Sequence, residues 1–212
     1  MSTASPVPAI PSVVPAGRMA GAPQPDIPVP GGLLLRPWRL ADADALLAAW
    51  RDPAIRRWNR PAAGGAEEAR AKIAQFEQRW HDEEWASWAI ARAENDTVVG
   101  FIAVADLHLR AGHGEIVYWV LPSARGQGVA LRATESVTEW AFGKLGLHRV
   151  ELTHSVANAA SCRVAEKAGF RLEGIKTSAA LHADGWHDMH LHARIRDDGV
   201  LNSSKDVHPS AA

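Results

Sequence analysis

One junction, between residues 116 and 145, constrains the fold of this chain more than any other stretch. An apolar strand pattern ends at Leu121, two glycines (Gly126 and Gly128) follow with one residue between them, and a helical pattern starts near residue 127. Glycine permits positive φ angles and lets a ligand approach the backbone closely. The first N–H groups of a helix lack intrahelical acceptors and carry partial positive charge. The junction therefore predicts an anion site suited to a pyrophosphate.

Two common phosphate loops do not fit this junction. A P-loop requires a lysine followed by serine or threonine after its glycines, and neither is present. A dinucleotide fingerprint requires a third glycine, and Leu131 stands at that position. What remains is an arginine followed by Gly-x-Gly-x-Ala. A glycine turn that only caps an ordinary helix is the alternative.

Length and composition limit the class of protein. A chain of 212 residues most simply forms one domain with a sizeable core. Its formal net charge of −1, without runs of like charge, argues against nucleic acid as a main partner. The single cysteine, Cys162, excludes an internal disulfide and fits a reducing compartment. No apolar run approaches the roughly 20 residues of a membrane helix. These features predict a cytoplasmic protein.

The ends of the chain differ from its middle. Residues 1–30 hold eight of the thirteen prolines. Proline lacks an N–H group and fixes φ, so we expect neither helix nor strand pairing there. We predict a flexible tail over residues 1–31, a domain over residues 32–196, and a second flexible tail over residues 197–212.

Hydrophobic periodicity predicts the order β-α-α-β-β-β-α-β-α-β-β within the domain. Strands are expected at residues 33–38, 85–93, 97–108, 115–121, 148–156, 169–182 and 186–195. Helices are expected after an N-cap at Asp42, at residues 66–84, from about 127 to 145, and at 158–167. The tryptophans are expected to pack in the core, with lining of an acceptor pocket as the alternative for Trp58 and Trp85.

This order, with the glycine loop after the fourth strand, resembles the GNAT N-acetyltransferase superfamily, most closely its RimJ/RimL branch. The densest matches are PSARGQGVA at 122–130, LHRVEL at 147–152, NAAS at 158–161 and VAEKAGFRLEG at 164–174. Shorter matches lie at 35–37, 42–43, 52–53, 100–102, 115–119 and 140–142. The resemblance implies an α/β fold with a twisted, mostly antiparallel sheet of about seven strands and helices on both faces.

The resemblance also implies acetyl-CoA as co-substrate and a set of contacts to it. In the family the strand before the loop separates from its neighbour, which frees backbone groups for the pantetheine arm. The residues implied to bind the cofactor are Val120, Leu121, Arg125, Gly126, Gln127, Gly128, Val129, Ala130, Asn158 and Ser161. From the sequence alone, Asn158 and Ser161 also fit plain helix capping, and the two roles are compatible.

Transfer of an acetyl group to an amine requires a base for the amine, a donor for the oxyanion and an acid for the leaving thiolate. The resemblance makes Glu115 our candidate base, although a surface carboxylate at a strand edge is the alternative. Many superfamily members carry a tyrosine acid on the helix that begins here at Asn158. That helix has none, and the only tyrosine, Tyr118, lies on a strand. Ser161 is therefore our candidate acid, and the N–H of Val120 our candidate oxyanion donor.

Two other groups of residues suggest chemistry that we do not expect. His182, His187, His190 and His192 crowd the last hairpin, and a metal site with Asp188 would look similar. Because His-x-His is common in strands and no cysteine pair accompanies it, we predict no metal. Cys162 adjoins Ser161, but a lone helical cysteine is usually a small buried hydrophobe rather than a nucleophile.

Together these observations predict an acetyl-CoA-dependent N-acetyltransferase that works by direct transfer in a ternary complex. The leading acceptor is a protein or peptide α-amino group. The alternatives are a small-molecule amine, such as an antibiotic or a polyamine, and a non-catalytic acyl-CoA sensor on the same fold. The family also implies a homodimer, and we expect no nucleic-acid or membrane partner.

Overall fold

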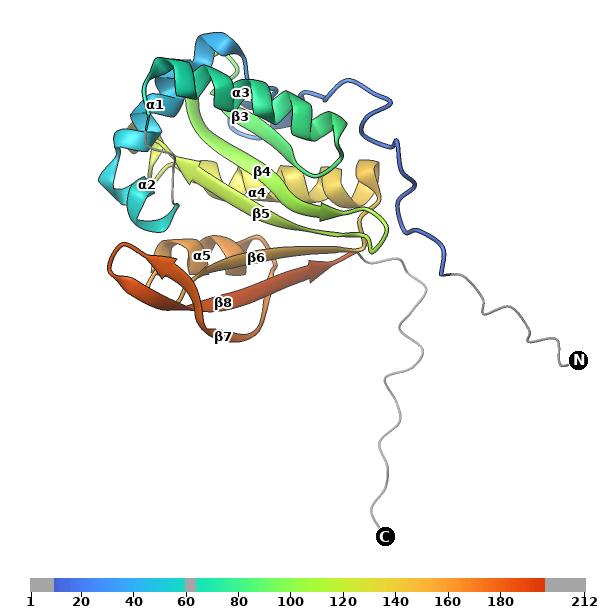
Figure 1. Ribbon diagram of the computed structural model, residues 1–212. Coiled ribbons are helices and arrows are strands. Elements are labelled where there is room, and N and C mark those ends of the chain that lie inside the picture. Colours follow the sequence, from blue (N-terminus) through green and yellow to red (C-terminus); the bar gives the residue numbers. More distant parts are fainter. Residues whose placement is uncertain (1–9, 60–63, 197–212) are drawn as a thin grey trace, which may run out of the picture.

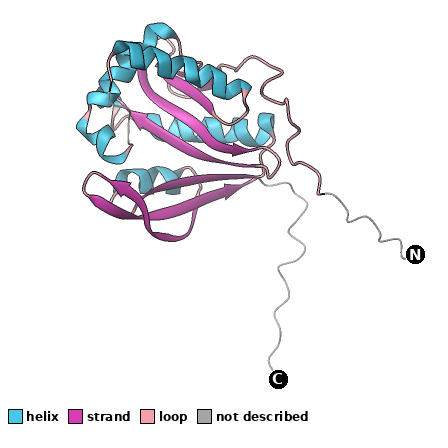
Figure 2. Ribbon diagram, in the orientation of Figure 1, coloured by secondary structure: helices cyan, strands magenta, loops and turns pink. Residues whose placement is uncertain are grey.

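The computed structural model describes residues 10–59 and 64–196, which form one sheet with helices on both faces (Figures 1 and 2). The sheet has eight strands in the order β1-β2-β3-β4-β5-β6-β8-β7. The strands are β1 (Ile27–Val29), β2 (Leu33–Arg36), β3 (Ala86–Arg92), β4 (Val98–His108), β5 (His113–Val120), β6 (Arg149–Ser155), β7 (Arg171–His182) and β8 (Gly185–Ile195). All neighbours pair antiparallel except β5 and β6. The predicted fold class is confirmed, with β1 as an additional strand.

The helices follow the predicted amphipathic patterns, apart from the short helix that begins after Asp52, which we did not predict. They are α1 (Ala43–Arg51), α2 (Pro53–Trp58), α3 (Ala66–His81), α4 (Val129–Trp140) and α5 (Ala159–Lys167), with short turns η1 (Leu40–Asp42), η2 (Pro122–Ala124) and η3 (Ala141–Leu145). Along α3 the buried residues are Ala69, Ile73, Phe76 and Trp80, which form one helical stripe. One core cluster packs under α1 and α3, and a second packs under α4 and α5.

The sheet divides where β5 meets β6. These two strands pair in parallel only from His113 to Glu115, opposite Arg149 to Glu151. Beyond that point β5 stays paired with β4 as far as Val120, and β6 stays paired with β8 as far as Ser155. Figure 1 shows the two halves of the sheet diverging from this short contact. The predicted separation of the strand before the glycine loop is thus present.

The structure departs from the predicted tail between residues 10 and 31. Val14 and Met19 are buried in the core, and Ile27–Val29 forms an edge strand opposite Leu33–Leu35. Pro28 is compatible with a strand at this position because an edge strand has a neighbour on one side only. The position where proline lacks an N–H can therefore face away from the ladder. The other predicted tail residues, 1–9 and 197–212, lie outside the described part of the chain.

Carbonyl groups of this proline-rich segment accept hydrogen bonds from two buried tryptophans. Trp80 Nε1 donates to the carbonyl of Ala22 at 3.0 Å, and Trp88 Nε1 donates to the carbonyl of Pro25 at 2.8 Å. A buried indole needs an acceptor, and a proline-rich segment keeps its carbonyls free because it has few N–H groups. The segment is therefore part of the core, for a reason that hydrophobic periodicity does not reveal.

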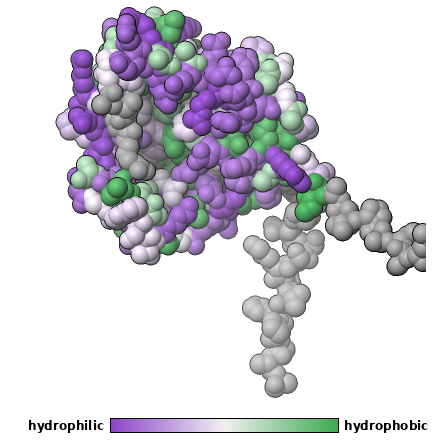
Figure 3. Space-filling model, in the orientation of Figure 1, coloured by the Kyte–Doolittle hydropathy of each residue, from purple (hydrophilic) through white to green (hydrophobic). Residues whose placement is uncertain are grey.

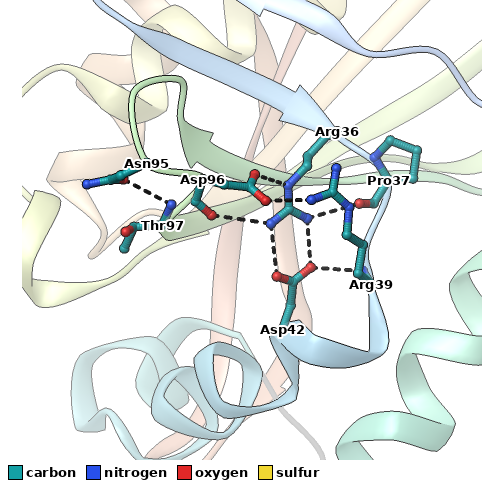
Figure 4. Close-up of polar contacts among 7 residues, drawn as sticks. All are labelled: Arg36, Pro37, Arg39, Asp42, Asn95, Asp96 and Thr97. Carbon is teal, nitrogen blue, oxygen red and sulfur yellow. Dashed lines mark hydrogen bonds and ion pairs between the residues drawn. The ribbon is translucent and has the colours of Figure 1, made fainter.

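A buried arginine fixes the entry to α1 (Figure 4). Arg36 is 1% exposed and donates from both terminal nitrogens to Asp42, at 2.7 and 2.9 Å. Its Nε donates to Asp96 in the turn between β3 and β4, and Arg39 shares that carboxylate. The hydrogen bond from Arg36 is the main reason why the pKa of Asp96 lies below its ordinary value.

Asp42 occupies the N-cap position of α1 that we predicted, but its side chain does not cap that helix. Its carboxylate makes no capping bond to that helix and instead accepts from Arg36 and from the backbone N–H of Arg39 at 2.8 Å. The ion pair is worth more to the fold than the cap would be, because Arg36 would otherwise be a buried charge without a partner.

In the described residues no helix is long and apolar enough to cross a membrane. On the face drawn in Figure 3, hydrophilic residues cover most of the surface and hydrophobic patches are smaller.

We expect Asp42→Asn to lower the free energy of unfolding by about 3–5 kcal/mol, because it leaves the Arg36 guanidinium buried with half of its charge partners removed. The measurement is urea unfolding at neutral pH. Asp44→Asn, at an exposed acidic residue in the first turn of α1, is the control and should cost about 1 kcal/mol or less. Equal losses in the two variants would contradict the role of the ion pair.

Candidate functional site

A cavity of about 660 Å³ lies between β5 and β6 where the two strands diverge. Its walls come from β5, the glycine loop, the start of α4, the end of β6, α5 and α2. Of the tryptophans that we considered for an acceptor pocket, Trp58 lines this cavity and Trp85 is not among the residues that line it. A second cavity of about 730 Å³ lies between the N-terminal segment and the end of α4, away from the glycine loop.

The glycine loop has the backbone geometry that its sequence predicts. Gly126 and Gly128 have φ angles of +76° and +71°, in the left-handed region that glycine favours. Gly128 is the N-cap of α4 and provides no side-chain cap, so the N–H groups of the first turn are not capped by it. Gly126, Gly128, Val129 and Ala130 line the cavity. α4 begins at Val129, two residues later than we predicted.

The side chain of Gln127, in the predicted loop, binds neighbouring residues instead of lining the cavity. Its Nε2 donates to the carbonyl of Ser123 at 3.0 Å, and its Oε1 accepts from Arg92 at 3.1 Å. It is not among the residues that line the cavity. These bonds hold the loop against η2 and β3.

Arg125 ties the loop to the opposite wall. Its Nε donates to the carbonyl of Val120 at 3.1 Å, and its terminal nitrogen contacts the carboxylate of Asp52. Asp52 also caps α2 by accepting from the N–H of Ile55 at 2.8 Å. Burial raises the pKa of Asp52, but the hydrogen bonds from Arg125 and Ile55 outweigh it and hold that pKa below its ordinary value. Arg125 also lines the cavity.

The two predicted backbone sites on β5, Val120 and Leu121, differ in their hydrogen bonds. The N–H of Leu121 donates to Val99 at 2.9 Å, and its carbonyl accepts from Ala124 at 3.0 Å, so Leu121 does not offer a free N–H as we predicted. Backbone groups of alternate residues in an antiparallel strand point to opposite sides. Because Leu121 points to β4, the N–H of Val120 points to the side from which β6 has separated.

The start of α5 brings the predicted Asn158 and Ser161 to the cavity. Asn158 Oδ1 accepts from the N–H of Ser161 at 3.1 Å, which confirms the helix cap. The hydroxyl of Ser161 lies 2.9 Å from the hydroxyl of Tyr118 on β5. Burial raises the pKa of Tyr118 to about 12, although the hydrogen bond to Ser161 opposes that shift. Tyr118 is thus protonated at neutral pH.

The sequence does not favour Tyr118 as the acid, because it lies on a strand rather than on the helix after Asn158. The structure places its hydroxyl at that helix all the same, by a contact between residues 43 positions apart. Strand alternation puts Tyr118 on the same face as Ile116 and Val120, but it does not reveal which helix covers that face. No local signal could have found this pair.

Glu115 lies on the other face of β5. Its Oε1 accepts a hydrogen bond from the hydroxyl of Thr153 on β6, and Glu115 itself is not among the residues that line the cavity. Thr153 does line it. The structure therefore connects Glu115 to the cavity through Thr153 rather than directly.

The histidines of the last hairpin fall into two groups. The rings of His182 and His187 lie 4.3 Å apart by their centroids, beside the cavity wall. His190 and His192 lie farther along β8, on the face covered by α5. Asp188 does not join either group of histidines. Its carboxylate accepts a hydrogen bond from the N–H of Ser178 at 2.8 Å and so stabilises an irregular part of β7.

Comparison with known proteins agrees with this arrangement. The acetyltransferase (GNAT) domain family matches residues 32–171. The uncharacterized N-acetyltransferase YoaA of Bacillus subtilis is 30% identical over 147 residues, which cover 68% of this chain and 81% of that protein. The ribosomal-protein-serine acetyltransferase of Escherichia coli is 30% identical over 132 residues, covering 62% of this chain and 73% of that one.

A solved structure, RimJ of Mycobacterium smegmatis in complex with a CoA-disulfide, superposes with a TM-score of 0.71 at 25% identity. The superposition covers 81% of this chain and 86% of RimJ. The family match spans more than half of the chain and includes the glycine loop and the start of α5. This chain therefore belongs to the GNAT family and is an N-acetyltransferase.

Proposed function

We propose that this enzyme transfers the acetyl group of acetyl-CoA to the N-terminal α-amino group of a protein. The observation that carries the proposal is the cavity in the divided sheet, which joins the glycine loop at one end to the Tyr118–Ser161 pair at the other. The relative named a ribosomal-protein-serine acetyltransferase supports the acceptor class. A cytoplasmic location stays a prediction from composition, and a homodimer stays a prediction from the family.

The charge of the cavity fits an anionic co-substrate. Its cationic residues are Arg125 in the loop and Arg163 and Lys167 on α5, and the lining contains no acidic residue among those described. We propose that the amides of the glycine loop and the first turn of α4 hold the pyrophosphate. Arg163 and Lys167, four residues apart on one helix face, would then add charge for the remaining phosphate.

The same charge argues against one alternative acceptor. A polyamine carries several positive charges and needs a negative site, whereas this lining is positive. A protein N-terminus brings a single amine, which must be neutral to attack. Free α-amino groups titrate near 8, so a sizeable fraction of them is neutral at physiological pH.

In the proposed reaction the amine nitrogen bonds to the thioester carbon, and the bond from that carbon to sulfur breaks. The N–H of Val120 donates to the oxyanion of the tetrahedral intermediate. The proton lost by the amine passes to Thr153 and on to Glu115. The leaving thiolate receives a proton from Ser161, which takes one from Tyr118. Glu115 then releases the proton it gained to solvent and Tyr118 takes one up from solvent, so both groups return to their starting states.

A panel of acceptors tests the proposed function. We expect release of coenzyme A with peptides that have a free N-terminus and none with the same peptides carrying an acetylated N-terminus. Gly128→Trp should abolish both turnover and acetyl-CoA binding, the latter measured by calorimetry. The new side chain would block the loop, and a residue other than glycine would be strained at the φ of +71°. Turnover only with antibiotics or polyamines would overturn the acceptor class, and tight acetyl-CoA binding with no turnover on any amine would favour a sensor.

Tyr118→Phe should lower kcat by up to about 10²-fold, the lower end for acid catalysis, because a thiolate leaves readily without help. Acetyl-CoA affinity should stay within about threefold, since one hydroxyl is removed and the ring remains. Because the pKa of Tyr118 is about 12, the wild-type rate should show no loss from its ionisation as pH rises from 7 to 10. An unchanged kcat in Tyr118→Phe would remove the tyrosine from the mechanism.

Thr153 and Glu115 are tested as a relay. Glu115→Gln and Thr153→Val should lower kcat by a similar factor, on the order of 10²-fold, and the double variant by no more than either. Thr153→Ser keeps the hydroxyl and should restore most of the rate. The readout is kcat between pH 6 and 9 with a peptide acceptor. If Thr153→Val is fully active while Glu115→Gln is not, the proton does not pass through Thr153.

A further inference from the structure

Three histidines and the single cysteine converge beside α5, and of these four residues only His154 also lines the cavity that the proposed function uses. They are His154 on β6, His190 and His192 on β8, and Cys162 on α5. One potential ligand atom from each side chain lies within 4.8 Å of those of the other three. The sheet register explains the meeting: His154 pairs directly with His190, and His192 is two residues away on the same face of β8.

Each of the three imidazoles has a nitrogen that lacks a hydrogen-bond partner. The atoms are His154 Nε2, His190 Nδ1 and His192 Nε2, all buried and without a partner among the described residues. His154 and His192 are only 4% and 1% exposed. A buried polar atom without a partner is costly and uncommon in folded proteins. Three of them at one point indicate a ligand that accepts lone pairs.

The other nitrogens hold two of the rings in the orientation that a ligand needs. His154 Nδ1 lies 2.9 Å from the carbonyl of Ser155, and His192 Nδ1 lies 3.5 Å from the carbonyl of Phe170. A carbonyl can only accept, so the proton is on Nδ1 in both rings and the lone pair is on Nε2. Backbone carbonyls commonly orient metal-binding histidines in this way.

We propose that His154, His190, His192 and Cys162 bind one Zn²⁺ ion. Three imidazoles and one thiolate are a donor set that Zn²⁺ prefers, and four protein ligands make a closed, structural site. With bonds of about 2.0–2.1 Å to nitrogen and about 2.3 Å to sulfur, ligand atoms in a tetrahedron lie roughly 3.3–3.6 Å apart. Small side-chain rotations therefore close the site from its present spacing of at most 4.8 Å.

Zinc binding requires the Cys162 thiol to lose its proton. The Cys162 thiol now donates to Glu166, with Sγ 3.6 Å from Oε1. When the sulfur–zinc bond forms, the thiol proton is released to solvent and no electrons change hands. Glu166 is exposed and stays solvated when this weak bond is lost.

The site would fix the helix that carries the proposed acid. Ser161 and Cys162 are neighbours on α5, and their side chains diverge: Ser161 meets Tyr118 in the cavity, while Cys162 meets the histidines. A zinc ion would pin the first turns of α5 to β6 and β8 and so hold Ser161 at Tyr118. This consequence rests on the proposed function, but the metal site itself does not.

The test uses the full chain without a histidine tag, reduced and freed of metal by a chelator. We expect one Zn²⁺ per chain by calorimetry and by elemental analysis after dialysis, and a higher midpoint of thermal unfolding with zinc. Co²⁺ should give the visible bands of a tetrahedral site and a thiolate charge-transfer band in the near ultraviolet. None of these readouts requires turnover, so their failure is distinct from failure of the acetyltransferase proposal.

Cys162→Ser is the main variant, because Cys162 is only partly buried and the substitution is small. It should abolish the charge-transfer band and weaken zinc binding by more than about 100-fold, which exceeds the usual cost of changing a residue that only orients a metal ligand. His192→Gln should also abolish tight binding. His81→Gln, at an exposed histidine in the last turn of α3, should bind like the wild type. Absence of zinc binding by the wild type, or equal binding by Cys162→Ser, would overturn the proposal.

Discussion

The short parallel contact between β5 and β6 is the constraint on which the rest of the molecule depends. Only three residue pairs join the two halves of the sheet there, whereas β4–β5 and β6–β8 continue their ladders past the division. A sheet that divides leaves backbone polar groups without ladder partners along the gap. In this fold some of those groups are satisfied from the side, as when Arg125 donates to Val120, and others face the cavity. We propose that this unpaired edge is the surface that binds acetyl-CoA.

Since backbone pairing does not hold the halves together beyond Glu115, side chains do so. Thr153 reaches Glu115 across the gap, and Tyr118 reaches Ser161 on the helix that packs on β6 and β7. Each of these contacts also belongs to a proposed proton path. The groups that keep the gap at its width are therefore the groups proposed to act in it, which couples the shape of the site to its chemistry.

The sequence predicted what local patterns determine, namely the order of elements, the positive φ angles at the two loop glycines and the cap at Asn158. It did not predict what depends on contacts between distant segments. Tyr118 and Ser161 are 43 residues apart, and Asp42 resembles an N-cap until Arg36 is seen beside it. We expect no metal from the sequence because His-x-His is common in strands and no cysteine pair accompanies it, and the residues that complete the group, His154 and Cys162, lie elsewhere in the chain. Likewise, composition predicted a loose proline-rich segment, and the acceptors it provides for Trp80 and Trp88 are invisible without the fold.

Tyr118 has one more consequence, because it is the only tyrosine in the chain. Replacing tyrosine with a fluorinated analogue during expression would place a single fluorine label at the cavity wall, beside Ser161. One resonance would then report on occupancy, local motion and the state of the neighbouring hydroxyl, without assignment and without competition from other sites. The chain thus carries a natural single-site probe at the position where its proposed chemistry ends.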